Sequence, residues 1–298
     1  MQTNVYVLFH KNCLDGFGGK YAAWKYFKDK HEYAVKYIPV QYNDPVPEIV
    51  FDANNVNTEV YILDFSYPHA VLENLHSKVS KLVVLDHHKT AMAELSDLPY
   101  AKFDMNKSGC VMAWEYFFPG QYVPQLLLHV QDRDLWQWKL PDTDAILTIF
   151  DARRSDMHAW DYYCDPNMDE ESLNKNLRHL KENGQHVTQY RDSLVNRQVK
   201  NATVINIQGY RVGVLNASTL ISEIGHAVYS KEELDVDFSM SYFLLDGNFA
   251  ILSFRSSGDI DVSTIAKSFG QGGGHAGAAG VKVSIQDLCD ILNGKHAN

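Results

Sequence analysis

Three features are scarce in this sequence, and each scarcity excludes a class of protein. Apolar runs reach only four to six residues, far short of the roughly 20 that a membrane-spanning helix needs. The four cysteines are widely spaced and include no CxxC pair, which excludes the usual disulfide scaffold and zinc ribbon. Positive charge is also scarce, because 27 basic against 37 acidic residues leave a net charge of −10. Proteins that grip long nucleic acid usually carry the opposite sign, so we expect neither a membrane nor a long-duplex partner.

The length and the N-terminus indicate a two-domain cytoplasmic protein. A chain of 298 residues is long for one compact domain and sufficient for two. The segment MQTNVYVLFH has neither the basic region nor the cleavage site of a signal peptide. Histidine, in contrast to cysteine, is abundant: there are 13, several of them beside aspartate or glycine.

Short apolar runs that end in polar residues recur in the first half of the chain. VYVLFH (5–10), EVYILDFS (59–66) and KLVVLDHH (81–88) are typical of buried strands in a parallel sheet. Helix-like stretches, GFGGKYAAWKYFKDKH and PHAVLENLHSKV, lie between them. This alternation predicts a doubly wound α/β domain. A fourth run, QLLLHVQDRDLW (125–136), contains leucine rather than valine, so it is either a strand or the end of a helix.

Acids and imidazoles follow these runs, at the sheet edge where ligands of open parallel sheets bind. They are His10, Asp15, Asp64, Asp86, His87, His88 and Asp132. Each alone is more simply a helix cap, a turn former or a structural histidine. Together at one edge they would repel one another unless cations lay among them. Mixed carboxylate and imidazole ligands suit Mn²⁺, and also Fe, Co or Zn, and two bridged metals are suited to in-line attack on phosphorus.

The second half of the chain has a different pattern. Residues 169–200 are polar and helical in periodicity, and a new β pattern begins at about residue 201. We predict a catalytic domain over residues 1–185, a helical linker over 186–200, and a smaller α/β C-terminal domain with a mixed sheet over 201–298. GQGGGHAGAAG (270–280) is too specific for a flexible linker, since small residues let backbone amides approach a phosphate. Arg255 suits phosphate or carboxylate recognition, or is simply an exposed residue on an edge strand.

These motifs resemble the DHH phosphoesterase superfamily. The resemblance lies in DHH after an apolar strand, in the upstream His…Asp-Gly segment and in the C-terminal GGGHAGAAG. More narrowly, the motifs resemble the two-domain branch of this superfamily, which has a DHH-associated C-terminal domain. That branch includes nanoRNases (oligoribonucleases), pAp phosphatases, dinucleotide phosphodiesterases and RecJ-like exonucleases. The motifs follow the order of that branch and extend over the whole chain. DHH followed by GGGH is a specific combination.

The resemblance implies a site with two divalent metal ions, with Mn²⁺ expected. One metal would be held by His10 and Asp64, and the second by Asp15, Asp64, His87 and Asp132, with Asp64 bridging. Two residues would be catalytic: Asp86 would orient His87 or lie behind the ligands, and His88 would contact the phosphate or protonate the leaving group. In the C-terminal domain, substrate would be bound by Arg255, Gly273, Gly274 and His275.

Two positions depart from the family pattern or leave it open. Relatives often place two carboxylates in the first motif, with one residue between them, whereas HKNCLDG offers only Asp15. Asn12 or Cys13 stands near the other position; an amide oxygen is a weaker ligand, and a thiolate favours softer metals. In DRDLW, either Asp132 or Asp134 could be the fourth-motif ligand, and we prefer Asp132 because it is nearer to the apolar run.

The function that this resemblance implies is a Mn²⁺-dependent phosphodiesterase. It would hydrolyse very short oligonucleotides or linear dinucleotides to 5′-mononucleotides through a hydroxide activated by two metals. A pAp phosphatase or an exopolyphosphatase-like phosphomonoesterase would use the same site. A nucleotide-binding regulatory module with weak catalysis is the alternative from another class, supported only by the missing carboxylate. An exposed sheet edge in either domain could pair with a second copy of the chain, which would form a homodimer.

Overall fold

The chain forms two compact units, residues 1–188 and residues 189–298. The computed structural model describes residues 2–11, 13–42, 44–48, 57–165, 167–245 and 247–295. The first unit is built on a five-stranded sheet in the order β2-β1-β3-β4-β5, in which every neighbouring pair is parallel. Its strands are β1 (Thr3–His10), β2 (Tyr33–Val40), β3 (Thr58–Leu63), β4 (Lys81–Asp86) and β5 (Ala101–Phe103).

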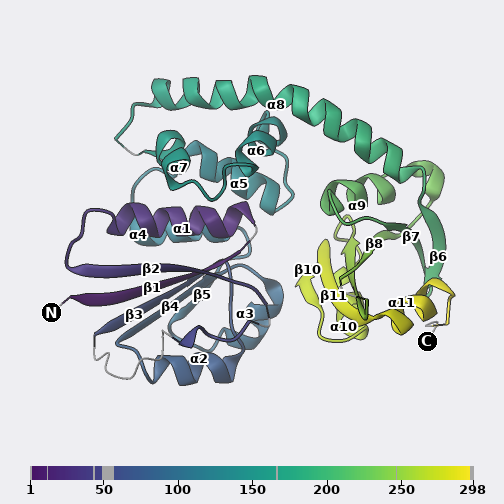
Figure 1. The fold of residues 1–298 in the computed structure, drawn as a ribbon, viewed down its shortest axis with the longest axis horizontal. Helices are drawn as coiled ribbons and strands as arrows, with labels where there is room; N and C mark the ends of the chain where they lie inside the picture. The colour runs from purple at the N-terminus through teal and green to yellow at the C-terminus, as the bar shows by residue number, and fades with distance from the viewer. Residues whose placement is uncertain are drawn as a thin grey trace. The chain divides into compact units, whose positions relative to one another are not determined.

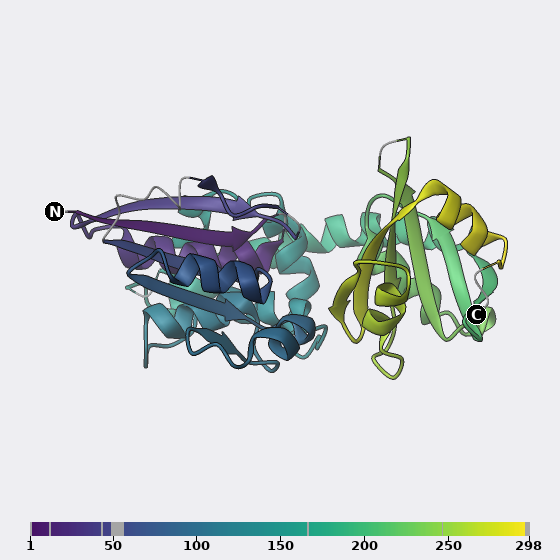
Figure 2. The same ribbon diagram turned by 90° about the horizontal axis from the view of Figure 1, so that it is seen from below.

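Both faces of this sheet are apolar, because alternate residues of each strand point to opposite sides. On β1, Val5 and Val7 pack into one core with α1 (Leu14–Phe27) and α4 (Gly109–Phe117). Tyr6 and Leu8 pack into the other core with α2 (His69–His76) and α3 (Lys89–Leu95). Figure 1 shows these two helical layers on either side of the sheet, and in Figure 2 the dark blue α2 lies over its strands. The arrangement confirms the predicted doubly wound parallel sheet.

Further helices complete the first unit on the side of α1. They are α5 (Gln125–Asp134), α6 (Thr143–Asp151), α7 (Met157–Cys164) and α8 (Glu170–Val199). The run 125–136, left open between strand and helix, is therefore the helix α5 and its C-terminus. The polar stretch that the periodicity predicts as helical is α8, which passes the boundary between the two units.

The second unit contains a six-stranded sheet in the order β10-β11-β9-β8-β7-β6. Its strands are β6 (Thr203–Ile207), β7 (Tyr210–Asn216), β8 (Phe238–Leu244), β9 (Phe249–Arg255), β10 (Gly273–His275) and β11 (Ala278–Ser284). Only β7 and β8 pair in parallel, so the sheet is mixed, as predicted. α10 (Val262–Ser268) and α11 (Ile285–Leu292) share one apolar core with the sheet, and α9 (Ile221–Tyr229) packs into another (Figure 1).

Across the described residues, no helix combines the length and the apolar character that crossing a bilayer requires. The longest, α8, is 30 residues long but is polar in sequence.

Candidate metal centre

Polar side chains from three strands collect at the carboxyl edge of the first sheet. β1 ends at His10, Asp64 directly follows β3, and β4 ends at Asp86, which is followed by His87 and His88. Because these strands are parallel and adjacent, their carboxyl ends meet along one edge. The predicted convergence of these five residues is what the structure shows.

Asp64 lies at the centre of this edge. Its backbone φ is +56°, in the left-handed region that few non-glycine residues adopt and that often marks a functional position. Its Oδ2 lies 3.4 Å from Nδ1 of His10, and its Oδ1 lies 3.2 Å from Nε2 of His87. The two oxygens of one carboxylate therefore face two separate imidazoles, as a carboxylate that bridged two metal ions would have to do.

Asp15, in the first turn of α1, is held by the N-terminus of α4. Its Oδ2 accepts a hydrogen bond from the amide of Gly109 at 2.6 Å, and its Oδ1 accepts one from the amide of Cys110 at 2.9 Å. Residue 109 has to be glycine, because a Cβ there would lie 2.5 Å from Cβ of Asp64 and 2.9 Å from Oδ2 of Asp15. The partial positive charge of the helix N-terminus favours the carboxylate at this buried position.

Three carboxylates surround the buried ring of His87. Its Nε2 lies 3.2 Å from Asp64, 3.3 Å from Asp134 and 3.5 Å from Asp15. One imidazolium offsets only one of these three negative charges. We refer to His10, Cys13, Asp15, Asp64, His87 and Asp134 as the ligand cluster, since their side-chain donor atoms face one another at this edge.

The crowding of like charges shifts the protonation of the ligand cluster. Burial and the charges of Asp64 and Asp134 raise the pKa of Asp15 well above its ordinary value. Burial by itself would lower the pKa of His87, but the hydrogen bond to Asp64 and the charges of Asp134 and Asp15 raise that pKa to about 11. Without a cation, protons held on Asp15 and His87 would therefore offset part of the surplus negative charge.

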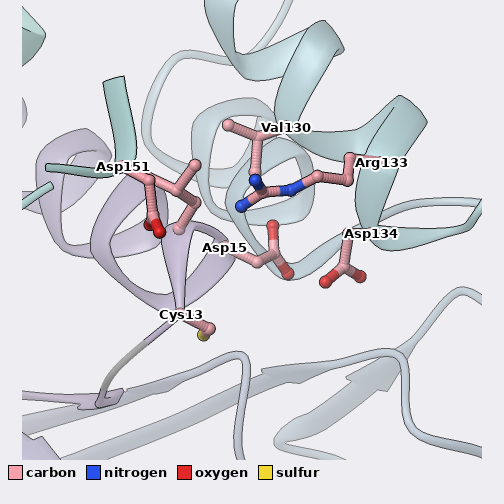
Figure 3. Close-up of a pocket in the computed structure, with 7 residues that line it drawn as sticks. Cys13, Asp15, Val130, Arg133, Asp134 and Asp151 are labelled. Atoms are coloured by element: carbon pink, nitrogen blue, oxygen red, sulfur yellow. The ribbon is translucent and has the colours of Figure 1, made fainter. Parts of the chain in front are cut away.

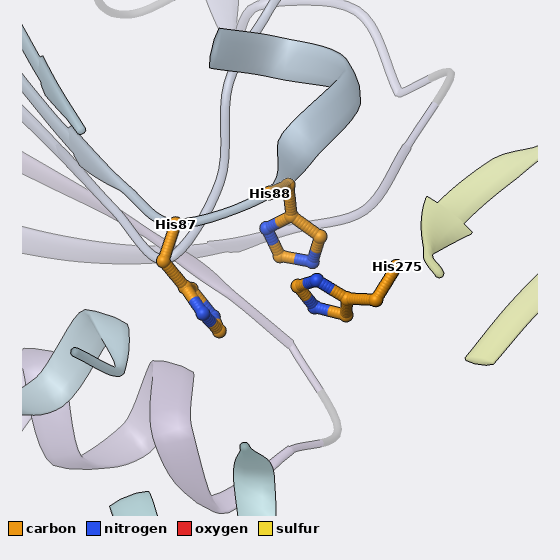
Figure 4. A group of neighbouring side chains, drawn as sticks. All are labelled: His87, His88 and His275. Atoms are coloured by element: carbon orange, nitrogen blue, oxygen red, sulfur yellow. The ribbon is translucent and has the colours of Figure 1, made fainter. Parts of the chain in front are cut away.

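Asp86 orients its neighbours and is fully buried. Its Oδ2 accepts a hydrogen bond from Oγ of Ser66 at 2.6 Å, and its Oδ1 lies 2.6 Å from Nδ1 of His88. The amide of His87 donates to the same Oδ1 at 2.8 Å. The rings of the two histidines point in different directions, with centroids 4.9 Å apart (Figure 4). The resemblance implied that Asp86 orients His87 or lies behind the ligands, and the ring that it holds in the structure is that of His88.

The two candidate acids of DRDLW have different surroundings. The carboxylate of Asp132 accepts hydrogen bonds from the amides of Lys139 and Leu140, at 2.7 and 3.1 Å, and from Oγ1 of Thr143 at 2.7 Å. It is thereby used in closing the turn that leads into α6. Asp134, at the last position of α5, is the acid that lies 3.3 Å from His87. The geometry therefore favours Asp134, the alternative that the sequence left open, over Asp132.

The chain is similar to several known proteins. The DHHA1 domain family matches residues 221–295. The chain is 32% identical over 292 residues to the uncharacterized protein R106 of Acanthamoeba polyphaga mimivirus, covering 93% of this chain and 67% of the relative. An exopolyphosphatase-related protein of Bacteroides fragilis has the same fold, with a TM-score of 0.54 at 13% identity over 98% of this chain and 91% of that one.

A RecJ structure from Thermus thermophilus, in complex with Mn²⁺, also shares the fold. Its TM-score is 0.52 at 11% identity, covering 98% of this chain and 51% of the RecJ chain. The chain belongs to the DHH phosphoesterase superfamily. Its second unit contains the DHHA1 domain of that superfamily.

The DHHA1 domain brings the four predicted substrate residues to one end of its sheet. His275 on β10 is opposite Ala278 on β11, which is opposite Arg255 on β9, so their side chains lie on one face. The Arg255 guanidinium donates to the carbonyl of Phe254 and to Oγ of Ser222, both at 2.8 Å. Gly274 has a φ of +142°, and a Cβ there would meet the carbonyl of Ala278, so only glycine permits this close strand pairing. Gly273 is opposite Gly280 in the same pair of strands.

Sequence reasoning missed Tyr42 and left Cys13 undecided. Tyr42 is 41% exposed, and the centroid of its ring lies 5.5 Å from that of His10 and 5.7 Å from that of His88. No motif marks this tyrosine, which follows β2 by two residues, although its place after a strand is a general signal. Sγ of Cys13 lies 3.2 Å from Oδ2 of Asp64. Asn12, the other candidate, lies outside the described residues.

A pocket of about 170 Å³ opens beside the ligand cluster. It is lined by Cys13, Leu14, Asp15, Val130, Arg133, Asp134 and Asp151. Figure 3 shows the carboxylates of Asp15, Asp134 and Asp151 around it, together with the guanidinium of Arg133. Arg133 thus brings a positive charge to an otherwise acidic wall.

The donors of this edge fit divalent cations. Asp64 faces one group made of His10 and Cys13, and a second group made of Asp15, His87 and Asp134. The donor atoms of His10, Cys13 and Asp64 lie within 4.8 Å of one another, and so do those of Asp15, His87 and Asp134, so that one ion can contact each set together. Buried carboxylate charge in excess of the local positive charge is the electrostatic condition that a cation relieves.

Proposed function

We propose that this protein is a divalent-metal-dependent phosphodiesterase that hydrolyses very short oligonucleotides or linear dinucleotides to 5′-mononucleotides. The observation that carries the proposal is the placement of Asp64, whose two oxygens face two separate groups of donors. Membership of the DHH phosphoesterase superfamily supports it, and so does the Mn²⁺ complex of the RecJ structure that shares this fold. Mn²⁺ is the cation that we expect at a site rich in carboxylate and imidazole.

One cation would be held by His10, Cys13 and Asp64. The second would be held by Asp64, Asp15, His87 and Asp134. When bound, the two cations would lower the pKa of water and offset the charge of the phosphoryl oxygens. The N-terminus of α4 keeps Asp15 in its orientation through two backbone hydrogen bonds. These contacts preorganise the donors before any ion is bound.

His88 would act on the substrate itself. Asp86 Oδ1 lies 2.6 Å from Nδ1 of His88, so Nε2 is the ring nitrogen that would contact a phosphate oxygen or the leaving oxygen of a bound substrate. Burial by itself would lower the pKa of His88, but the charge and hydrogen bond of Asp86 raise it above its ordinary value. A protonated His88 is the form that can give a proton to the leaving oxygen.

Charge and aromatic exposure support a short nucleotide substrate. With a net charge of −10, the protein has no excess positive charge with which to bind a long phosphate backbone. Tyr42 is an exposed residue whose ring lies beside those of His10 and His88, where a nucleobase could stack. In the DHHA1 domain, we assign binding of a substrate phosphate to Arg255, Gly273, Gly274 and His275.

A phosphomonoesterase acting on pAp or polyphosphate is the second candidate. It is favoured by the structural likeness to the exopolyphosphatase-related protein of Bacteroides fragilis. The same ligand cluster would serve, because only the leaving group and the walls of the substrate site differ.

The deciding experiment offers pApA, pAp and polyphosphate side by side to the purified full-length protein with Mn²⁺. We expect conversion of pApA to AMP, abolished in Asp64→Asn and retained in Asp97→Asn, whose exposed carboxylate pairs with His69 and is not part of the ligand cluster. Turnover of pAp or polyphosphate alone would replace the diesterase by the phosphomonoesterase. No turnover, together with no heat of Mn²⁺ binding by calorimetry, would favour a regulatory module instead.

A further inference from the structure

Cys13 stands where its thiol meets two members of the ligand cluster. Sγ lies 3.2 Å from Oδ2 of Asp64 and 3.5 Å from Nδ1 of His10. The donor atoms of these three residues lie within 4.8 Å of one another. A single cation can therefore contact a thiolate, an imidazole and a carboxylate at this place.

The backbone fixes the thiol in this position. Cys13 is the N-cap of α1, with an extended backbone at φ −125° and ψ 152°, and its Sγ accepts a hydrogen bond from the amide of Gly16 at 3.2 Å. Capping alone does not explain a cysteine, because sulfur is a weak acceptor, and Ser, Asp and Asn are the preferred caps. The capping position does explain why the sulfur faces His10 and Asp64 without any rearrangement of the chain.

The other three cysteines have different surroundings, although the side chain of Cys110 also interacts with the carboxylate of Asp15. Cys164 is buried in the apolar core around α7, and Cys289 is exposed on α11. Cys110 is buried, with its sulfur near Oγ of Ser108 and the carbonyl of Leu127. Among the described residues, Cys13 is the cysteine found in a group of donors that could hold a metal.

We propose that His10, Cys13 and Asp64 form a thiolate-containing site that selects a thiophilic divalent cation such as Zn²⁺, Co²⁺ or Fe²⁺ over Mg²⁺ or Mn²⁺. This inference rests on the proposed function and deepens it, because the two neighbouring sites would then differ in metal preference. Soft thiolate ligands favour these ions, whereas hard oxygen ligands favour Mg²⁺ and Mn²⁺. Three protein ligands of mixed type are also the usual set of a catalytic zinc site. On binding, the thiol proton is released to solvent and the sulfur bonds to the ion.

The test is a titration of the metal-free, full-length protein with Co²⁺, followed by absorption spectroscopy. A thiolate bound to Co²⁺ gives a charge-transfer band in the near ultraviolet, and we expect it to appear and then to disappear on addition of Zn²⁺. The band should be absent in Cys13→Asp and Cys13→Ser, and present in Cys289→Ser. Asp and Ser are both good N-caps, so α1 is retained in the first two variants. Binding of Co²⁺ without the band, or a band that survives Cys13→Asp, would contradict the proposal.

A second readout uses alkylation of the thiols by iodoacetamide, mapped by peptide mass spectrometry. We expect Zn²⁺ to protect Cys13 and to leave the exposed Cys289 reactive in the same sample. Equal alkylation of Cys13 with and without Zn²⁺ would overturn the inference.

These outcomes separate this inference from the proposed function. A band that depends on Cys13, with no turnover of any phosphoester, would retain the thiolate site and reject the phosphodiesterase. Turnover of pApA without the band would retain the enzyme and reject the thiolate ligand. In the active enzyme, Cys13→Asp should shift the preferred cation at this site toward Mn²⁺, because it supplies the second carboxylate of the first motif.

Discussion

The carboxyl edge of the first sheet and the glycine-rich edge of the second are built on opposite principles. The first collects side chains that repel one another: three carboxylates lie within 3.5 Å of the Nε2 of one buried histidine. The second removes side chains, so that β10 can pair closely with β11 at Gly274. The first edge therefore stores unfavourable charge that a cation can relieve, whereas the second depends on backbone geometry that needs no ion. Substitutions at the first should change metal binding, and substitutions at the second should change stability.

The largest effect is expected for Asp64→Asn, which removes the charge shared by both groups of donors. Asn tolerates the left-handed backbone of this position, so the fold should be kept. We expect the affinity for both cations to fall by about a hundredfold or more, exceeding the effect of residues that only support ligands. Calorimetric titrations with Mn²⁺ and with Co²⁺ measure this for the two sites, and the thermal unfolding of the protein in EDTA is the control. Unchanged binding of both ions would show that the carboxyl edge does not hold cations through Asp64.

The next test compares two acids on one helix, Asp134 and Asp132. Asp134→Asn should lower the affinity for one cation by about tenfold to a hundredfold. It should hardly change the free energy of unfolding of the metal-free protein. Asp132→Asn should lower the free energy of unfolding by about 2 kcal/mol, because its carboxylate accepts three hydrogen bonds. Mn²⁺ titration and urea unfolding of both variants check this. If the two effects were exchanged, Asp132 would be the ligand, as the sequence first suggested.

Gly274→Ala tests the second edge. A Cβ at this position combines a strained φ of +142° with contact to the carbonyl of Ala278, so we expect a loss of about 2 kcal/mol. Gly277→Ala is the matched control, because its Cβ would lie 3.3 Å from the nearest atom, the carbonyl oxygen of Ser256. Calorimetry should show a transition of the second unit lowered by about 10 °C in Gly274→Ala alone, with Mn²⁺ binding unchanged. Equal stability of both variants would mean that close strand pairing is not what requires glycine.

The smallest effect is expected for Tyr42→Ala, which changes the surroundings of the first edge without changing its charge. Loss of a stacking ring should raise KM for pApA about fivefold, equivalent to about 1 kcal/mol, and leave kcat nearly unchanged. Tyr42→Phe keeps the ring and should behave as the unsubstituted protein. Steady-state kinetics with pApA and polyphosphate measure the difference. An equal rise in KM for polyphosphate, which has no base, would contradict stacking.

Much of the first unit could be predicted from sequence because its candidate metal ligands come directly after buried, apolar strands. Three apolar runs predicted β1, β3 and β4, and parallel pairing placed their polar ends together. β2 and β5 were not predicted: β2 is an edge strand that contains Pro39 and is only partly buried, and β5 spans only three residues. Neither has the continuous apolar run that marks a central parallel strand.

The sequence by itself determined the doubly wound sheet and the gathering of acids and imidazoles at one edge, because strand periodicity and parallel topology dictate these. Tertiary structure decided which donors meet. Asp132 and Asp134 are two positions apart on α5 and so point in different directions, and only the packing of the helix turns one of them toward His87. Likewise, the sequence placed a cysteine in the first motif, but only the cap of α1 directs its sulfur to Asp64. Local patterns specify elements, whereas distances between side chains from different elements depend on how those elements pack.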